Sequence, residues 1–220
     1  MAYPTVDKPY GLKPINLIGG QVFAGATRQR RIASGASSIG YGDPVQLTSS
    51  GTISVSTTTD TPPTAGFAGV FLGCNYVSSV TGQPSCSQAW ISGTAVKSGT
   101  YINAYVADDP NTLFKAVGVT ASLVVSTSSG FVYEDIGTNV ELVANTLNTT
   151  TNDSQQGLLV GSVATTRSLP IRIVDVVEDT AFVSSGTTYY PEVIVKFNAP
   201  YLTSVSLIVG GHAYNNPLGV

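Results

Sequence analysis

The chain has 220 residues, a formal net charge of −3 at pH 7, and charged side chains at only 10% of its positions. An ordinary soluble domain carries roughly 25% charged residues, so uncharged polar residues and glycine must form most of this surface. The acidic balance excludes the long-range positive field that draws a protein to nucleic acid. No apolar run approaches the roughly 18 residues of a membrane span. We therefore expect no nucleic-acid partner and no membrane partner.

Residues 1–20 are expected to form an N-terminal arm, because they hold three prolines and two adjacent glycines with little amphipathic pattern. Asp7 and Lys8 stand where a signal peptide would have its apolar core, which predicts a protein that stays in the cytoplasm where it is made. Apolar side chains on an arm would stay exposed to water unless the arm docks on another surface. We therefore expect the arm to pack on a neighbouring subunit. The apolar residues concerned are Tyr10, Leu12, Ile15, Leu17 and Ile18, together with Phe23 just beyond the arm.

Strand signals dominate the rest of the chain. Short β-branched and aromatic runs are broken by Gly, Pro, Asn and Ser at short intervals, which is typical of a sandwich or barrel. We predict a mainly β body with little helix. The expected strands are Gln21–Ala33, Pro44–Leu47, Thr52–Ser56, Gly69–Tyr76, Gln88–Ile91, Tyr101–Val106, Leu113–Val117, Gly157–Val163, Ile171–Val177 and Glu192–Phe197. The last should lie in mid-sheet, because it is apolar on one face and partly apolar on the other.

Three arginines form the densest charge feature of the chain, at Arg28, Arg30 and Arg31. In a strand, Arg28 and Arg30 share one face and Arg31 lies on the other. Two interpretations stay open. The arginines either meet an acidic partner or the chain's own carboxylates, or they protect an edge strand from pairing with another chain.

The two cysteines, Cys74 and Cys86, flank a stretch with Gly, Ser and Pro that is compatible with a hairpin. A disulfide between them is geometrically possible. The missing signal peptide favours reduced, buried structural thiols instead.

Four parts of the chain are expected: an arm at 1–20, a β domain at 21–138, a further β region at 139–200 and a C-terminal tail at 201–220. The third part either completes the body or forms a second small domain. One short helix is expected near Asn152–Leu158, because Asn152 or Asp153 could cap it.

No catalytic, cofactor or metal site can be assembled from the sequence. His212, the single histidine, lies in the Gly- and Asn-rich tail, where a rigid and desolvated catalytic base is hard to build. Neighbouring acids such as Asp108 and Asp109 are more typical of turns and solvated charge than of a glycosidase or calcium site. We expect a protein that is not an enzyme.

Five runs of residues carry a resemblance to known proteins. They are Tyr10–Gln21 (YGLKPINLIGGQ), Ile32–Gly35 (IASG), Gly42–Val45 (GDPV), Gly69–Cys74 (GVFLGC) and Val193–Asn198 (VIVKFN). Together they resemble a family of structural proteins encoded by marine tailed phages and cyanophages. The order of small and apolar residues from Gly42 onward is also similar to phage head decoration proteins of the β-tulip type.

This resemblance implies a β-tulip-like or β-sandwich-like body with extended arms, and the role of a capsid decoration (cement) protein. Such a protein would be made in the bacterial host cytoplasm and would sit on the outer capsid surface of the virion. It would bind the major capsid protein as a homotrimer and bridge capsomers. The segment from Gly11 to Phe23 would add a strand to a capsid sheet edge, and the three arginines are further candidate contacts. The chain is larger than minimal decoration proteins by the region Asn139–Val220.

Two other functions are weighed against this one. A phage tail, fibre or surface module that binds host glycan would gather aromatic side chains on an exposed face. The candidates for that face are Trp90, Tyr101, Tyr105, Tyr189 and Tyr190. A hydrolase on a β scaffold would need a carboxylate pair or a site centred on histidine.

Overall fold

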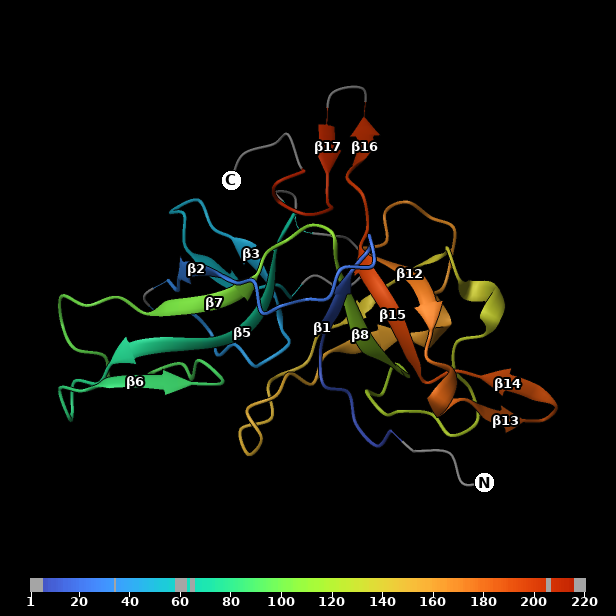
Figure 1. The fold of residues 1–220 in the computed structure, drawn as a ribbon, viewed down its shortest axis with the longest axis horizontal. Helices are drawn as coiled ribbons and strands as arrows, with labels where there is room; N and C mark the ends of the chain where they lie inside the picture. The colour runs from blue at the N-terminus through green and yellow to red at the C-terminus, as the bar shows by residue number, and fades with distance from the viewer. Residues whose placement is uncertain (1–5, 34, 58–62, 64–65, 205–206, 216–220) are drawn as a thin grey trace.

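The computed structural model describes residues 6–33, 35–57, 63, 66–204 and 207–215, and for 201–204 and 207–209 it describes the backbone alone. Strands dominate these residues (Figure 1). The helical elements among them are single 3-10 turns, at Tyr133–Asp135, Val160–Ser162 and Glu178–Thr180. The prediction of a mainly β body with little helix is confirmed. No helix in the described part has the length and apolar character to cross a membrane.

The first sheet comes from the N-terminal half of the chain. Its strands are β2 (Arg28–Arg31), β3 (Pro44–Leu47), β4 (Ile53–Val55), β5 (Phe67–Val77), β6 (Pro84–Ser87) and β7 (Asn103–Ala107). They lie in the order β2-β7-β5-β3-β4, and β6 pairs with the end of β5. A single bridge between Ile32 and Ile53 joins the two outer strands, so this sheet curls back on itself.

The second sheet is a nearly closed barrel. Its strands are β1 (Lys13–Leu17), β8 (Thr112–Val119), β9 (Asn139–Val140), β10 (Leu142–Val143), β11 (Gly157–Leu159), β12 (Ile171–Val176) and β15 (Glu192–Phe197). They lie in the order β10-β11-β8-β15-β12-β9, and β1 pairs with β8. Because only Glu141 separates β9 from β10, the two ends of this order are one continuous segment, which closes the sheet.

Strand β5 lies between the cores of the two sheets. Phe67 and Val70 pack into the core of the second sheet, whereas Ala68 and Phe71 pack into the core of the first. The ring of Phe67 stacks on Phe197 of β15, with 4.5 Å between the ring centroids. The apolar run of β5 is therefore continuous because both of its faces are buried.

Two hairpins extend away from the sheets (Figure 1). One joins β13 (Phe182–Ser184) to β14 (Thr187–Tyr189), and the other joins β16 (Tyr201–Ser204) to β17 (Leu207–Val209). The turn of the first hairpin places Ser185 and Gly186 at φ 52° and 83°. Two successive residues with positive φ are what a two-residue type I′ turn requires.

Several expected elements have their predicted bounds and others do not. Strands β3 and β15 match, and β15 lies between β8 and β12 as expected for a mid-sheet strand. The long strand expected over Gln21–Ala33 is wrong, because only Arg28–Arg31 pairs with β7. At Gln88–Ile91, Trp90 forms only an isolated bridge with Ile39, and the strand lies earlier, at β6.

The short helix expected near Asn152–Leu158 is also wrong. Asn152 adopts φ 61°, which a helix does not allow, and Asp153 forms a bridge with Tyr41. Strand β11 then begins at Gly157. Asp153 therefore pairs with Tyr41 in a loop of the first sheet, and the chain from Gly157 onward pairs with β10. These long-range contacts outweigh the local preference for a capped helix.

The expected arms lie partly in the body. Strand β1 pairs with β8 of its own chain, and residues 1–5 lie outside the described residues. After β17 the chain returns to the core, where Phe67 donates its backbone N–H to the carbonyl of Gly211 at 2.8 Å. His212 beside it is only 3% exposed, so the tail does hold a desolvated position, which the Gly- and Asn-rich sequence made hard to expect. Residues 205–206 and 216–220 of the expected tail lie outside the description.

After the first sheet, the chain returns to the second sheet between Ala107 and Thr112. An expected domain over 21–138 would have placed β8 with the first sheet. Instead β8 pairs with β15 and β11, so it belongs with residues 139–197.

Candidate functional site

Two of the candidate contact residues anchor the N-terminal segment inside the molecule. Leu12 is 1% exposed, and its backbone N–H donates to the carbonyl of Gly42 at 2.9 Å. The hydroxyl of Tyr10 donates to the carboxylate of Glu192, which also lies 3.1 Å from the Lys115 ammonium. Burial, and then the hydrogen bond to Glu192, raise the pKa of Tyr10. Tyr10 and Leu12 therefore stabilise the chain's own fold.

Strand β1 continues into a tight turn that leaves apolar side chains outside. Leu17 donates its N–H to the carbonyl of Gln21 at 2.7 Å, and Val22 forms a bridge with Asn16. Ile18 is 50% exposed and Val22 is 75% exposed. The remaining candidates of this region are half-buried, namely Ile15, Leu17 and Phe23.

The chain from residue 18 to residue 29 forms what we call the exposed connector, which runs from β1 of the second sheet to β2 of the first. Every residue in it except Phe23 is exposed. An exposed segment that carries apolar side chains is a surface on which a partner gains contact area.

The arginines of β2 lie on an edge strand and also bind a carboxylate of the same chain, so both interpretations made from the sequence describe part of their role. Strand β2 is an edge strand along Arg28–Arg31, and Arg28 Nε lies 2.6 Å from Asp108 Oδ2. Arg30 donates to the hydroxyl of Tyr214, which in turn donates to Asp108. The hydrogen bond to Asp108 raises the pKa of Arg28. This network ties the C-terminal segment to the first sheet.

Arg31 lies on the other face of β2, as the sequence predicts. Its guanidinium is 3.5 Å from the centroid of the Tyr101 ring, a cation–π contact between two exposed side chains. Arg31 and Tyr101 therefore form an exposed cation–π pair on the face of β2 that does not carry the Asp108 network.

The aromatic residues that a glycan site would need do not gather. Trp90 is 3% exposed and packs in the first sheet's core. Tyr189 packs against Phe182 in the β13–β14 hairpin, 5.6 Å between ring centroids, at the opposite end of Figure 1 from β6. Tyr190 packs on the core of the second sheet.

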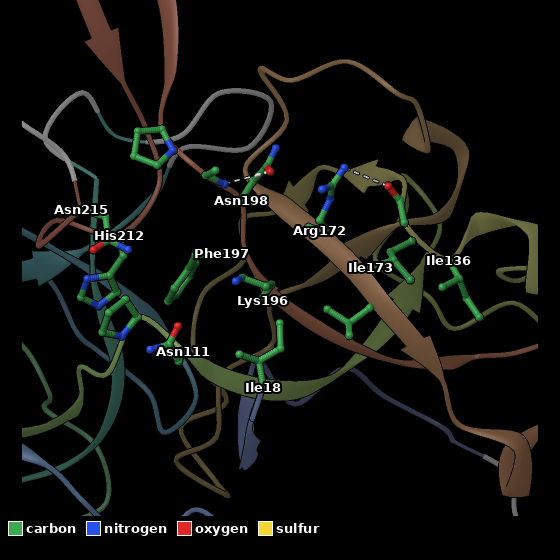
Figure 2. A pocket seen from close by; sticks show the side chains of 15 residues that line it. Ile18, Asn111, Ile136, Arg172, Ile173, Lys196, Phe197, Asn198, His212 and Asn215 are labelled. Carbon is green, nitrogen blue, oxygen red and sulfur yellow. Dashed lines mark hydrogen bonds between the residues drawn. The ribbon is translucent and has the colours of Figure 1, made fainter. Parts of the chain in front are cut away.

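A cavity of about 420 Å³ lies where the C-terminal segment passes over β12 and β15 (Figure 2). We call it the cation pocket, because Arg172 of β12 and Lys196 of β15 line it and no Asp or Glu does. These two residues are directly opposite each other in the antiparallel ladder, so their side chains share one face of the sheet. Arg172 Nη2 donates to the carbonyl of Gly137 at 3.0 Å, and its Nε donates to Asn139 Oδ1 at 3.3 Å.

His212 forms part of the pocket wall. Its Nδ1 accepts the backbone N–H of Tyr214 at 3.3 Å, so in the neutral ring Nε2 carries the proton. Nε2 is covered by protein and has no hydrogen-bond partner among the described residues. Burial lowers the pKa of His212 to about 4. The imidazole is therefore neutral at physiological pH. It packs against Phe197 and Tyr214 and so holds the C-terminal segment against the body.

Asn198 holds the rim of the pocket in place. Its Nδ2 donates to the carbonyl of Leu169 at 2.9 Å. Its Oδ1 accepts the N–H of Ala199 at 2.9 Å (Figure 2). The pocket therefore has a fixed polar rim at Asn198 and a fixed guanidinium at Arg172.

The sequence analysis did not find this pocket. Arg172 and Lys196 are single charges inside two strands that were predicted close to their observed bounds. The pairing of these strands with each other has no local signal in the sequence, and neither does the return of His212 over them.

Other candidate chemistry is limited in the described part of the chain. No three His, Cys, Asp or Glu side chains come together there in a way that could hold a metal ion. Cys74 is buried and Cys86 is exposed, and both are free thiols. Cys86 pairs with Asn75 rather than with Cys74, so the two thiols lie on opposite faces of the β5–β6 ladder.

Comparison with protein-family models, with curated proteins and with solved structures gave no match to this chain. The fold and its sites define a β-rich protein with two curled sheets, an exposed apolar connector and a cation-lined cavity.

Proposed function

We propose that this chain is a non-enzymatic structural protein of a tailed-phage virion, which decorates an icosahedral capsid and stabilises it by bridging capsomers. Its partners would be the major capsid protein and two further copies of itself. The observation that carries the proposal is the exposed connector, in which Ile18 and Val22 are 50% and 75% exposed.

The connector suits a contact with a large partner for two reasons. Its first residues are already held in place, because Ile18 donates its N–H to the carbonyl of Asn111 at 2.9 Å and Phe23 donates to the carbonyl of Ile15 at 3.4 Å. Ordering this part of the connector therefore costs little entropy on binding. Its apolar side chains are exposed in the isolated chain, so covering them contributes about 25 cal/mol for each Å² removed from water.

Bridging two capsomers also requires a second contact surface. The β13–β14 hairpin extends from the second sheet, away from the first sheet (Figure 1). Val183 on this hairpin is 67% exposed. The pairing of the Phe182 and Tyr189 rings stiffens the hairpin without covering Val183.

The low charge of the chain agrees with this role. Charged residues make up 10% of the sequence, and three of the cations lie together on β2. A surface formed largely of uncharged polar groups costs less to desolvate than a charged one when subunits pack together.

Cryo-electron microscopy of the virion that carries this protein tests the proposal. We expect icosahedrally ordered density on the outer shell, with residues before Ala24 in contact with the major capsid protein. Density confined to the tail vertex would overturn the proposal and favour a host-binding role.

A paired set of variants tests the connector itself. Ile18→Ser together with Val22→Ser should reduce the copies retained on purified virions. Val80→Ser is the matched control, because Val80 is 83% exposed on a turn of the first sheet. Equal retention of the two variants would exclude the connector as the capsid contact.

A further inference from the structure

The cation pocket has a chemistry that the structural role does not use. We propose that it binds a small organic carboxylate, whose charged group lies between Lys196 and Arg172 and whose apolar part packs on the wall of the cavity.

The charge of the pocket is the first step. Lys196 and Arg172 face each other across the β12–β15 ladder, and like charges directly opposite in a sheet destabilise it. The ion pairs among the described residues involve Arg28, Arg30 and Lys115, and none involves these two cations. No Asp or Glu lines the cavity beside this pair, although the chain has 13 acidic and only 10 basic residues. An anion between the two cations would remove their repulsion.

The donors of the pocket are the second step. Arg172 uses one N–H of Nη2 and the N–H of Nε in its bonds to Gly137 and Asn139, and these bonds hold the guanidinium in place. Arginine has five N–H donors, so others remain for a ligand. A guanidinium that is held in place and a lysine ammonium on the same face of the sheet are suitable donors for a carboxylate, because the hydrogen bonds are charge-assisted.

The apolar wall is the third step, and it selects an organic anion over an inorganic one. The half-buried Ile136 and Val174 line the cavity, and Ile18, which is 50% exposed, also lines it. A volume of about 420 Å³ is in the range of small-molecule sites. The Nε2 nitrogen of His212 is covered by protein, so the two cations carry the recognition of charge.

Binding of benzoate to the purified protein tests the proposal, with benzamide as the neutral analogue of the same shape. Calorimetry and amide chemical shifts should report a dissociation constant of about 1 mM or lower for benzoate. Shifted amides should lie in β12, β15 and residues 210–215. Benzamide should bind at least about tenfold more weakly, and added salt should weaken benzoate binding.

Variants of Lys196 separate charge recognition from shape. Lys196→Gln should weaken benzoate about tenfold or more, whereas Lys196→Arg should retain binding. Lys97→Gln is the control, because Lys97 is an exposed lysine in a loop of the first sheet. The unfolding midpoint of the Lys196→Gln protein should be no lower than that of the parent, because the substitution removes the repulsion with Arg172.

Three results would overturn the proposal: no benzoate binding, equal binding of benzamide, or equal binding by the Lys196→Gln protein. Because this test uses the isolated chain, its outcome is independent of where the protein lies in a virion.

Discussion

Tyr10 donates a hydrogen bond to the carboxylate of Glu192, although 182 residues separate them in the sequence. The contact joins the N-terminal segment to the centre of the second sheet. Glu192 is 4% exposed and has the Lys115 ammonium as its second partner, 3.1 Å away. A buried carboxylate needs such partners, because an uncompensated charge inside a protein costs several kcal/mol.

Removal of the Tyr10 hydroxyl should therefore destabilise the fold. We expect Tyr10→Phe to lower the free energy of unfolding by about 1–3 kcal/mol, because a buried acceptor loses its donor. Urea unfolding followed by fluorescence measures the change. Tyr133→Phe is the control, since Tyr133 is 58% exposed, and it should change stability by less than about 0.5 kcal/mol. Equal effects of the two substitutions would show that Glu192 does not depend on Tyr10.

Gly69 on β5 lies against the backbone of β7. A Cβ atom there would lie 2.3 Å from the carbonyl oxygen of Ala107, and the φ of Gly69 is +136°. We expect Gly69→Ala to lower stability by more than about 2 kcal/mol or to prevent folding, because both the contact and the backbone are strained. Gly161→Ala is the control, because a Cβ at Gly161 meets nothing within 4 Å. Thermal unfolding of the two proteins makes the comparison, and similar midpoints would contradict the strand packing at Gly69.

The two thiols should differ in reactivity. Burial raises the pKa of Cys74 to about 11, and Cys86 is exposed. The thiolate is the reactive form, so a disulfide reagent should titrate one thiol in the native protein and two after unfolding in denaturant. Cys86→Ser should abolish the native reaction. A native protein with no reactive thiol, which regains two on reduction, would instead indicate a Cys74–Cys86 disulfide.

The mainly β class of the fold could be predicted from the sequence, because strand formation depends partly on local features. The partly alternating Glu192–Phe197 and the run that begins at Pro44 have the expected bounds, since each is a short β-rich run next to residues that break strands. The helix expected after Asn152 failed for the opposite reason. A capping residue is a local preference, and pairing of Asp153 with Tyr41 outweighs it.

The candidate sites were harder to predict. Among the arm residues, Tyr10 and Leu12 are apolar side chains that could cover a partner or the chain's own body. Only their distant neighbours, Glu192 and Gly42, decide between the two. The cation pocket depends on the register of Arg172 with Lys196, which is a tertiary property. A rigid, desolvated position was hard to expect at His212 because its neighbours are glycine and asparagine, yet its backbone pairs with Phe67.

The burial of His212 predicts how stability depends on pH. In the unfolded chain its pKa is near the ordinary 6.5, and in the folded chain burial lowers it to about 4. Unfolding therefore takes up a proton between these values, and stability falls as the pH decreases from about 6.5 to about 4. Asp108 and Asp109 face the imidazole and oppose this shift, whereas Arg30 adds to it.

Comparison with the His212→Phe protein isolates this contribution. The substitution keeps a ring against Phe197 and Tyr214 and removes the only imidazole of the chain. Between pH 7 and pH 5 the parent should lose about 2 kcal/mol more stability than the variant, since one pKa unit corresponds to about 1.4 kcal/mol. The single imidazole also gives one set of proton resonances, whose titration should have its midpoint near pH 4. A midpoint near 6.5, with parallel pH profiles for the two proteins, would show that His212 is solvated and that the C-terminal segment does not dock against Phe67.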